Sequence, residues 1–187
     1  MGYASTVDTG QVTPWSLTHP ALAAAPSATS PVALVLNTTY LVPVELYADC
    51  ILTAIRVAHA ATSAGNVDLG IYDSSGNRLD HSGVASANTF ASKSQQLSLS
   101  NGNLSLSKGR YYLALWVDNA TDTYYMLTMT NTNLEPALAN ALNGTNPNGT
   151  GSTNTATGLL ATTTAMGGTI AATRMPVLQG VILGTGF

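Results

Sequence analysis

Charged residues are unusually scarce in this chain. Only 8% of its 187 residues are Asp, Glu, Lys or Arg, against about 25% in an average soluble protein. Ser, Thr, Asn and Gly fill many of the remaining positions. A freely diffusing enzyme normally relies on surface charge for solubility, so this composition is more typical of a protein packed among other subunits. The net charge is −3 and the six basic residues are scattered, so we expect no nucleic-acid partner.

Cysteine and long apolar runs are also scarce. Cys50 is the single cysteine, which excludes an intrachain disulfide and a cysteine-based metal cluster, and its apolar context predicts a buried structural thiol. The opening MGYASTVDTGQ has no basic segment followed by an apolar one, so we expect no signal peptide. No stretch approaches the ~20 apolar residues of a membrane helix, so we expect no membrane partner.

No group of residues predicts catalysis or a bound cofactor. The sequence has no HExxH pair, GxSxG elbow or P-loop. Three carboxylates, Asp73, Asp118 and Asp122, fall in predicted turns, where hydrogen bonds to the backbone account for them. The three histidines lie in unrelated contexts: His19, His59 and His81. We therefore expect no catalytic residues, no metal ligands, no cofactor and no enzymatic activity.

What is present is a pattern of short strands and turns. Residues 67–72 alternate between apolar and polar or small side chains, which predicts a half-buried strand, and the turn sequence DSSGN follows. The segment LSLSNGNLSLS at 97–107 has alternating leucines on both sides of Asn-Gly, which predicts a hairpin. The pattern predicts an all-β fold, an antiparallel jelly-roll-like β-sandwich with an extended N-terminal arm and a C-terminal extension. The expected strands are 39–47, 50–57, 67–72, 77–80, 94–99, 110–117 and 123–129.

Three regions differ in composition. Residues 1–36 hold four helix-breaking prolines and predict an extended N-terminal arm, and residues 37–130 form the predicted β-sandwich core. In residues 131–187 we expect a short helix over 133–142, a polar loop and a C-terminal strand or arm. The apolar tail from Met175 either completes the sandwich or contacts a neighbouring subunit.

The middle of the chain resembles a known family. The residues that carry the resemblance are Gly70-Ile71-Tyr72-Asp73, Gly76, Gly83 and Gly109-Arg110-Tyr111-Tyr112-Leu113-Ala114. This pattern resembles β-sandwich modules of tailed-bacteriophage virion proteins, which occur in head decoration (cement) proteins and in tail- or head-fibre proteins. The resemblance covers roughly the middle third of the chain and involves structural residues. It implies a virion protein made in the bacterial host cytoplasm.

Within that family, the whole chain favours a decoration protein on the capsid surface. Its low charge, single predicted domain and apolar ends suit a non-enzymatic protein that binds and stabilises the major capsid shell. Self-association as a homotrimer would multiply weak contacts through avidity. The expected partners are thus the major capsid protein and further copies of the chain. The candidate partner-binding residues are Trp15, Leu17, Val181, Ile182 and Phe187.

Two other functions remain open. The chain could be a fibre-tip or receptor-binding module that recognises host-surface glycans with an exposed tyrosine and the turns at 73–77 and 118–122. It could also be a carbohydrate-binding module attached to an enzyme. The tyrosine pairs at 111–112 and 124–125 invite a glycan platform, but adjacent strand residues face opposite sides, so we expect one of each pair to lie in the core.

Overall fold

The computed structural model describes residues 16–18, 30–128, 152–153, 157–162 and 174–183. These residues form antiparallel sheets, and no helix lies among them. The predicted all-β, antiparallel class is therefore confirmed for this part of the chain. The predicted helix at 133–142 lies outside the described residues.

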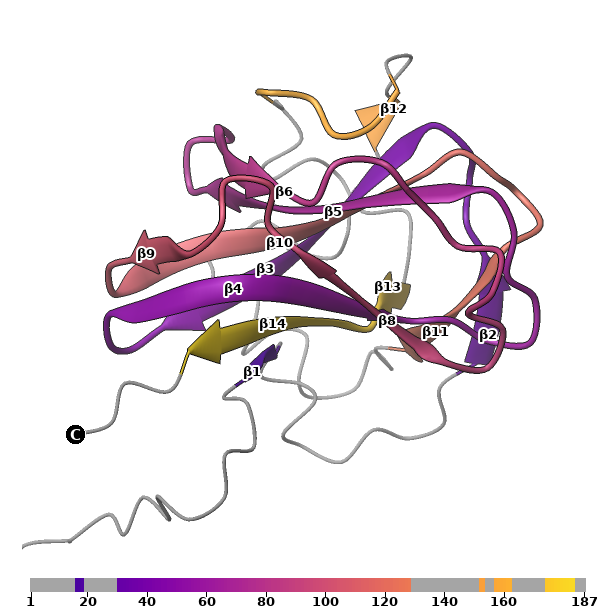
Figure 1. Cartoon of the computed structure of the whole chain (residues 1–187), viewed down its shortest axis with the longest axis horizontal. Coiled ribbons are helices and arrows are strands. Elements are labelled where there is room, and N and C mark those ends of the chain that lie inside the picture. The colour runs from indigo at the N-terminus through magenta and orange to yellow at the C-terminus, as the bar shows by residue number, and fades with distance from the viewer. Residues whose placement is uncertain (1–15, 19–29, 129–151, 154–156, 163–173, 184–187) are drawn as a thin grey trace, which may run out of the picture.

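The described residues form three sheets, whose strands are labelled in Figure 1. The five-stranded sheet has the order β1-β14-β4-β8, with β9 also paired to β4; its strands are β1 (Ser16–Thr18), β4 (Cys50–Ala58), β8 (Ser94–Ser98), β9 (Leu104–Leu106) and β14 (Leu178–Leu183). The six-stranded sheet has the order β12-β3-β10-β5-β6, with β7 also paired to β5; its strands are β3 (Thr38–Leu46), β5 (Asn66–Asp73), β6 (Arg78–His81), β7 (Ala85–Ser86), β10 (Gly109–Val117) and β12 (Ser152–Thr153). The three-stranded sheet contains β2 (Ser30–Ala33), β11 (Thr123–Thr128) and β13 (Arg174–Pro176).

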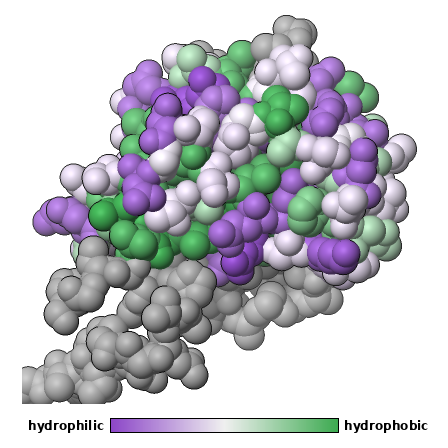
Figure 2. Space-filling view, in the orientation of Figure 1, coloured by the Kyte–Doolittle hydropathy of each residue, from purple (hydrophilic) through white to green (hydrophobic). Residues whose placement is uncertain are grey.

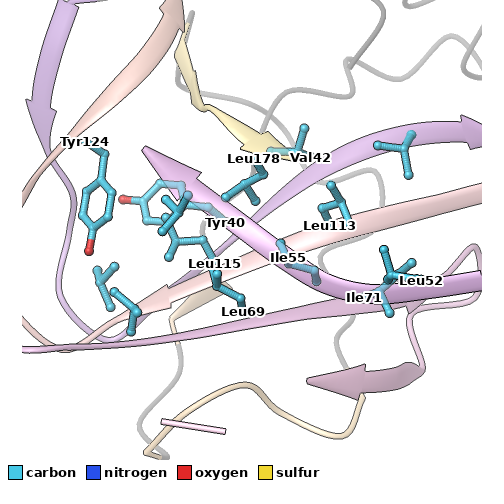
Figure 3. Packing of buried hydrophobic residues seen from close by; sticks show 14 of the residues in the cluster. Tyr40, Val42, Leu52, Ile55, Leu69, Ile71, Leu113, Leu115, Tyr124 and Leu178 are labelled. Carbon is cyan, nitrogen blue, oxygen red and sulfur yellow. The ribbon is translucent and has the colours of Figure 1, made fainter. Parts of the chain in front are cut away.

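The main core lies between the five-stranded and six-stranded sheets. Alternate residues of β5 and β10 point into it, because successive strand residues face opposite sides. Figure 3 shows side chains of these two strands beside side chains of β4 and β14. Fully buried members of this core include Leu52, Ile55, Leu69, Ile71, Leu113, Leu115 and Leu178. Apolar burial on this scale is the main force that stabilises the sheets.

The prediction that 67–72 forms a half-buried strand is wrong, because β5 is buried on both faces. Its residues from Val67 to Tyr72 are all buried. The second face belongs to a smaller apolar cluster that contains Leu41, Tyr72, Ala114, Trp116 and Leu159. Leu159 comes from a segment far along the chain, and that segment covers the face of the sheet that the local pattern assigns to solvent.

The predicted hairpin at 97–107 is also wrong. The Asn101-Gly102 turn forms, but β8 and β9 both pair with β4 and not with each other. The buried carboxylate of Asp80 accepts hydrogen bonds from Asn101 Nδ2 at 2.9 Å and from the backbone N–H of Asn101 at 3.3 Å. These bonds hold the turn toward β6, so the two leucine strands lie end to end along β4.

Both ends of the chain contribute strands to the sheets. β1 and β2 belong to the predicted N-terminal arm, yet they pair with β14 and β11 of the same chain. The sequence left two roles open for the C-terminal segment, and the structure places β14 beside β4. Between Val181 and Ile182 the register with β4 shifts, because Thr53 is an extra residue opposite this step and forms a bulge. Residues on the two sides of the bulge therefore keep their apolar side chains in the core.

Candidate functional site

The structure describes three of the five predicted partner-binding residues. Leu17 lies in β1, where its backbone is opposite Gly180 of β14. Val181 is half-buried, and Ile182 is half-buried and packs against the main core. Trp15 and Phe187 lie outside the described residues. The three described residues therefore share one edge of the five-stranded sheet.

The chain enters β1 and leaves β14 at the same end of this edge. Ser16 is opposite Val181 in an antiparallel pair, so the segment that precedes Ser16 and the segment that follows Leu183 depart next to each other. Leu183 is opposite Ile51, at the start of β4. In sequence, Trp15 directly precedes Ser16, and Phe187 follows shortly after Leu183.

Exposed apolar side chains gather at this end. Leu183 is 49% exposed and Tyr47, in the turn between β3 and β4, is 87% exposed. Val181 and Leu183 lie on the outer face of the sheet, because Ile182 between them points into the core. We name Tyr47, Ile51, Val181 and Leu183 the β14 corner. Figure 2 shows hydrophobic residues on the left of the molecule, where Figure 1 places the ends of β4 and β14.

A buried polar network joins β4, β8 and β11. His59 is fully buried, and its Nδ1 lies 3.3 Å from Asp122 Oδ2 and 3.4 Å from Oδ1. Its Nε2 lies 2.9 Å from Gln95 Oε1, and Gln95 Nε2 donates to the Ser86 carbonyl at 3.0 Å. Tyr124 donates its hydroxyl to Asp122 Oδ2 at 2.6 Å. Each buried polar group therefore has a partner, which is the condition for such a network to stabilise a core.

Another buried carboxylate, that of Asp68, lies on the outer face of the six-stranded sheet. Asp68 is fully buried, and its Oδ2 accepts the backbone N–H of Leu159 at 2.9 Å and faces His81 Nδ1 at 2.8 Å. Ser82 Oγ bonds to Asp68 Oδ1 at 3.3 Å and to the Gly83 carbonyl at 2.8 Å. Because the hydroxyl contacts the carboxylate and not the imidazole, these residues lack the serine–histidine contact of a nucleophilic triad. Asp68 instead holds the backbone of Leu159.

The turn carboxylates divide into two kinds. Asp73 accepts the backbone N–H groups of Ser75 at 2.8 Å and Asn77 at 2.9 Å, as predicted. Burial is the largest single influence on its pKa and acts to raise it, but the hydrogen bonds from Asn77, Ser75 and Gly76 together outweigh burial and lower the pKa. Asp118 accepts the backbone N–H of Asn66 at 2.6 Å. For Asp122 the prediction is wrong, since this carboxylate bonds to the side chains of the buried network.

Burial also sets the protonation of three potential donors. Desolvation raises the pKa of Tyr72 to about 12. Desolvation, with the hydrogen bond to Asp122 and its charge, raises the pKa of Tyr124 above its usual value. The pKa of the half-buried Cys50 thiol is raised by desolvation and by the charge of Asp49. A raised pKa keeps each of these three groups protonated and neutral in the core. For Cys50 it also makes the thiol a poor nucleophile.

The buried network was missed because its members are distant in sequence. His59 and Asp122 are 63 positions apart, and nothing local in either segment indicates the other.

Within the described residues, no cluster of three or more His, Cys, Asp or Glu side chains could hold a metal ion. In the same part of the chain, no helix is long and apolar enough to cross a membrane.

Comparison of this chain with known proteins identifies no relative. No protein-family model matches the chain, and neither a curated protein nor a solved structure matches it.

Proposed function

We propose that this chain is a non-enzymatic structural protein of a tailed-phage virion. In this proposal it is a capsid decoration protein, built on a jelly-roll-like β-sandwich, that binds and stabilises the major capsid shell as a homotrimer. The virion origin comes from the sequence resemblance. The observation that supports a shell-binding role is the β14 corner, where exposed apolar residues lie beside the points at which both terminal segments depart.

The corner offers a contact that many copies can repeat. Burying a large apolar side chain contributes roughly 1.5–3 kcal/mol, and Tyr47 and Leu183 both have much surface left to bury. Trp15 and Phe187 lie in the adjoining sequence and add aromatic area to the same contact in this proposal. Linked copies on one shell raise the total affinity further through avidity.

The glycan-binding alternative has less support from the geometry. β5 and β10 are antiparallel, with Asp73 opposite Tyr111 at one end and Val67 opposite Val117 at the other. The turn at 73–77 and the turn at 118–122 therefore lie at opposite ends of the same sheet. One glycan site cannot use both turns, and of the paired tyrosines Tyr124 is fully buried.

Co-sedimentation with empty capsid shells from the same source tests the proposal. We expect the double variant Tyr47→Ser/Leu183→Ser to bind roughly 100-fold more weakly, because two apolar contacts worth about 3 kcal/mol together are removed. The matched control is Val35→Ser/Leu36→Ser, which changes two residues that are 65% and 47% exposed in the turn between β2 and β3. Equal binding by the two double variants, or no binding by the wild-type chain, would contradict the proposal.

A further inference from the structure

The buried network around His59 contacts all three sheets. His59 directly follows β4 of the five-stranded sheet, and its Nε2 lies 2.9 Å from Oε1 of Gln95 in β8. The Gln95 side chain reaches the carbonyl of Ser86 in β7, which belongs to the six-stranded sheet. On the other side of the ring, Nδ1 faces Asp122, which accepts the hydroxyl of Tyr124 in β11 of the three-stranded sheet. One imidazole therefore connects groups from all three sheets.

Both ring nitrogens of His59 face oxygen atoms that accept hydrogen bonds. Nδ1 lies 3.3 Å from Asp122 Oδ2, and a carboxylate has no proton to donate. The orientation of the Gln95 amide follows from the Ser86 carbonyl, to which its nitrogen donates at 3.0 Å, so its oxygen is the atom that faces Nε2. A neutral imidazole has only one N–H, which would leave the other nitrogen bare against an acceptor. Only the doubly protonated ring donates on both sides.

The carboxylate of Asp122 requires a positive partner. Asp122 is fully buried, and a buried carboxylate without a counter-ion costs a large free energy. Among the described residues, its ion pair is with His59, and no lysine or arginine pairs with it. Tyr124 donates to Asp122 as a neutral group, because desolvation raises its pKa above the usual value. The nearby Lys93 directs its ammonium to the Thr89 carbonyl.

Two aromatic rings pack against the imidazole. The ring centroid of His59 lies 5.9 Å from that of Phe90 and 4.9 Å from that of Tyr124. A cation within about 6 Å of an aromatic centroid is attracted by the negative face of the ring. Asp118 adds a further negative charge, which acts on Tyr124. The groups around His59 therefore all favour a positive imidazole.

We propose that His59 is a buried imidazolium in the folded chain, and that its second ring proton holds the three sheets together until a rise in pH removes it. This proposal goes beyond the proposed function and does not depend on it. In water an imidazole loses this proton near pH 6.5. In the folded chain, the loss leaves one ring nitrogen bare against an oxygen and Asp122 without a counter-ion. The network is therefore intact at mildly acidic pH and weakens as the pH rises.

Nitrogen-15 NMR of the wild-type chain at pH 7.5 counts the ring protons directly. We expect two ring N–H signals for His59, because both nitrogens donate. Nuclear Overhauser contacts with the rings of Phe90 and Tyr124 assign these signals, so the assignment needs no variant. A single N–H signal with one bare nitrogen in His59 at this pH overturns the proposal.

The substitution Asp122→Asn tests the same proton through stability. The asparagine amide can donate to a neutral Nδ1, so this variant needs no second ring proton. In urea titrations, we expect the folding equilibrium constant of the wild type, divided by that of Asp122→Asn, to fall about tenfold per pH unit between pH 6 and 8. His19 and His81 are present in both chains and cancel from this ratio.

The matched control is Asp49→Asn, which changes an exposed carboxylate. Its ratio to the wild type should not vary over the same pH range. If the ratio for Asp122→Asn is equally constant, the proposal is overturned. Should Asp122→Asn fail to fold, the count of ring protons in the wild-type chain decides.

Discussion

The hydroxyl of Tyr124 gives a direct measure of the buried network. The substitution Tyr124→Phe keeps the ring, which is fully buried in the main core, and removes the 2.6 Å bond to Asp122. A hydrogen bond to a charged group contributes about 1.5–3 kcal/mol, and its loss leaves a buried acceptor short of a donor. We therefore expect the free energy of unfolding to fall by about 2 kcal/mol.

Urea unfolding, followed by tryptophan fluorescence and circular dichroism, measures this change. The matched control is Tyr125→Phe, next in the same strand, where the half-buried hydroxyl has no partner among the described residues. We expect that control to change the unfolding free energy by less than about 0.5 kcal/mol. In thermal melts, a loss of about 2 kcal/mol corresponds to roughly 4–8 °C for a chain of this size.

A double-mutant cycle sharpens the test. In an Asp122→Asn background the acceptor has no charge, so Tyr124→Phe should cost about 1 kcal/mol less than in the wild type. Equal losses for Tyr124→Phe and Tyr125→Phe would refute the role of the network. Additive losses in the cycle would show that the two residues do not interact.

Two further predictions concern the outer face of the six-stranded sheet. Leu159→Ala should lower the unfolding free energy by about 2–3 kcal/mol, because it empties a buried pocket. In the same urea titration, Leu160→Ala, at a half-buried neighbour, should cost less than half as much. Equal costs would show that Leu159 does not anchor its segment to the sheet. The raised pKa of Tyr72, about 12, makes stability fall as pH rises from about 10, where the unfolded phenol loses its proton and the folded one keeps it. Relative to Tyr72→Phe, the unfolding free energy of the wild-type chain should therefore decline by up to about 1.4 kcal/mol per pH unit above pH 10. Parallel urea midpoints for both chains between pH 9 and 12 would contradict this assignment.

The sequence predicts the strands well because their signals are local. β3, β4, β5 and β10 begin and end within one or two residues of the expected limits, since apolar alternation and turn residues act over a few positions. Pairing was harder to predict. β8 and β9 lie end to end because Asp80, from a different strand, binds the turn between them, and no pattern within 97–107 contains that partner.

Burial of the second face of β5 could have been suspected from two residues. Gly70 lies inside a strand, where glycine often marks a close approach by another part of the chain. Trp116 lies on the outer parity of β10, where a large aromatic needs a cover. The identity of the cover could not be predicted, because Leu159 is 91 positions from Asp68, which binds its backbone.

The pairing of β1 with β14 has a consequence for synthesis. A ribosome adds about 5–20 residues per second, so Thr18 waits many seconds before its partner Gln179 exists. The core strands β3, β5 and β10 can pair earlier, and the edge of the five-stranded sheet closes last. During that interval the backbone groups of β4 that later pair with β14 have no strand from this chain beside them, which exposes an edge that favours aggregation. The low charge of the chain offers little protection there, so we expect its yield on expression to depend on how fast the last strand follows.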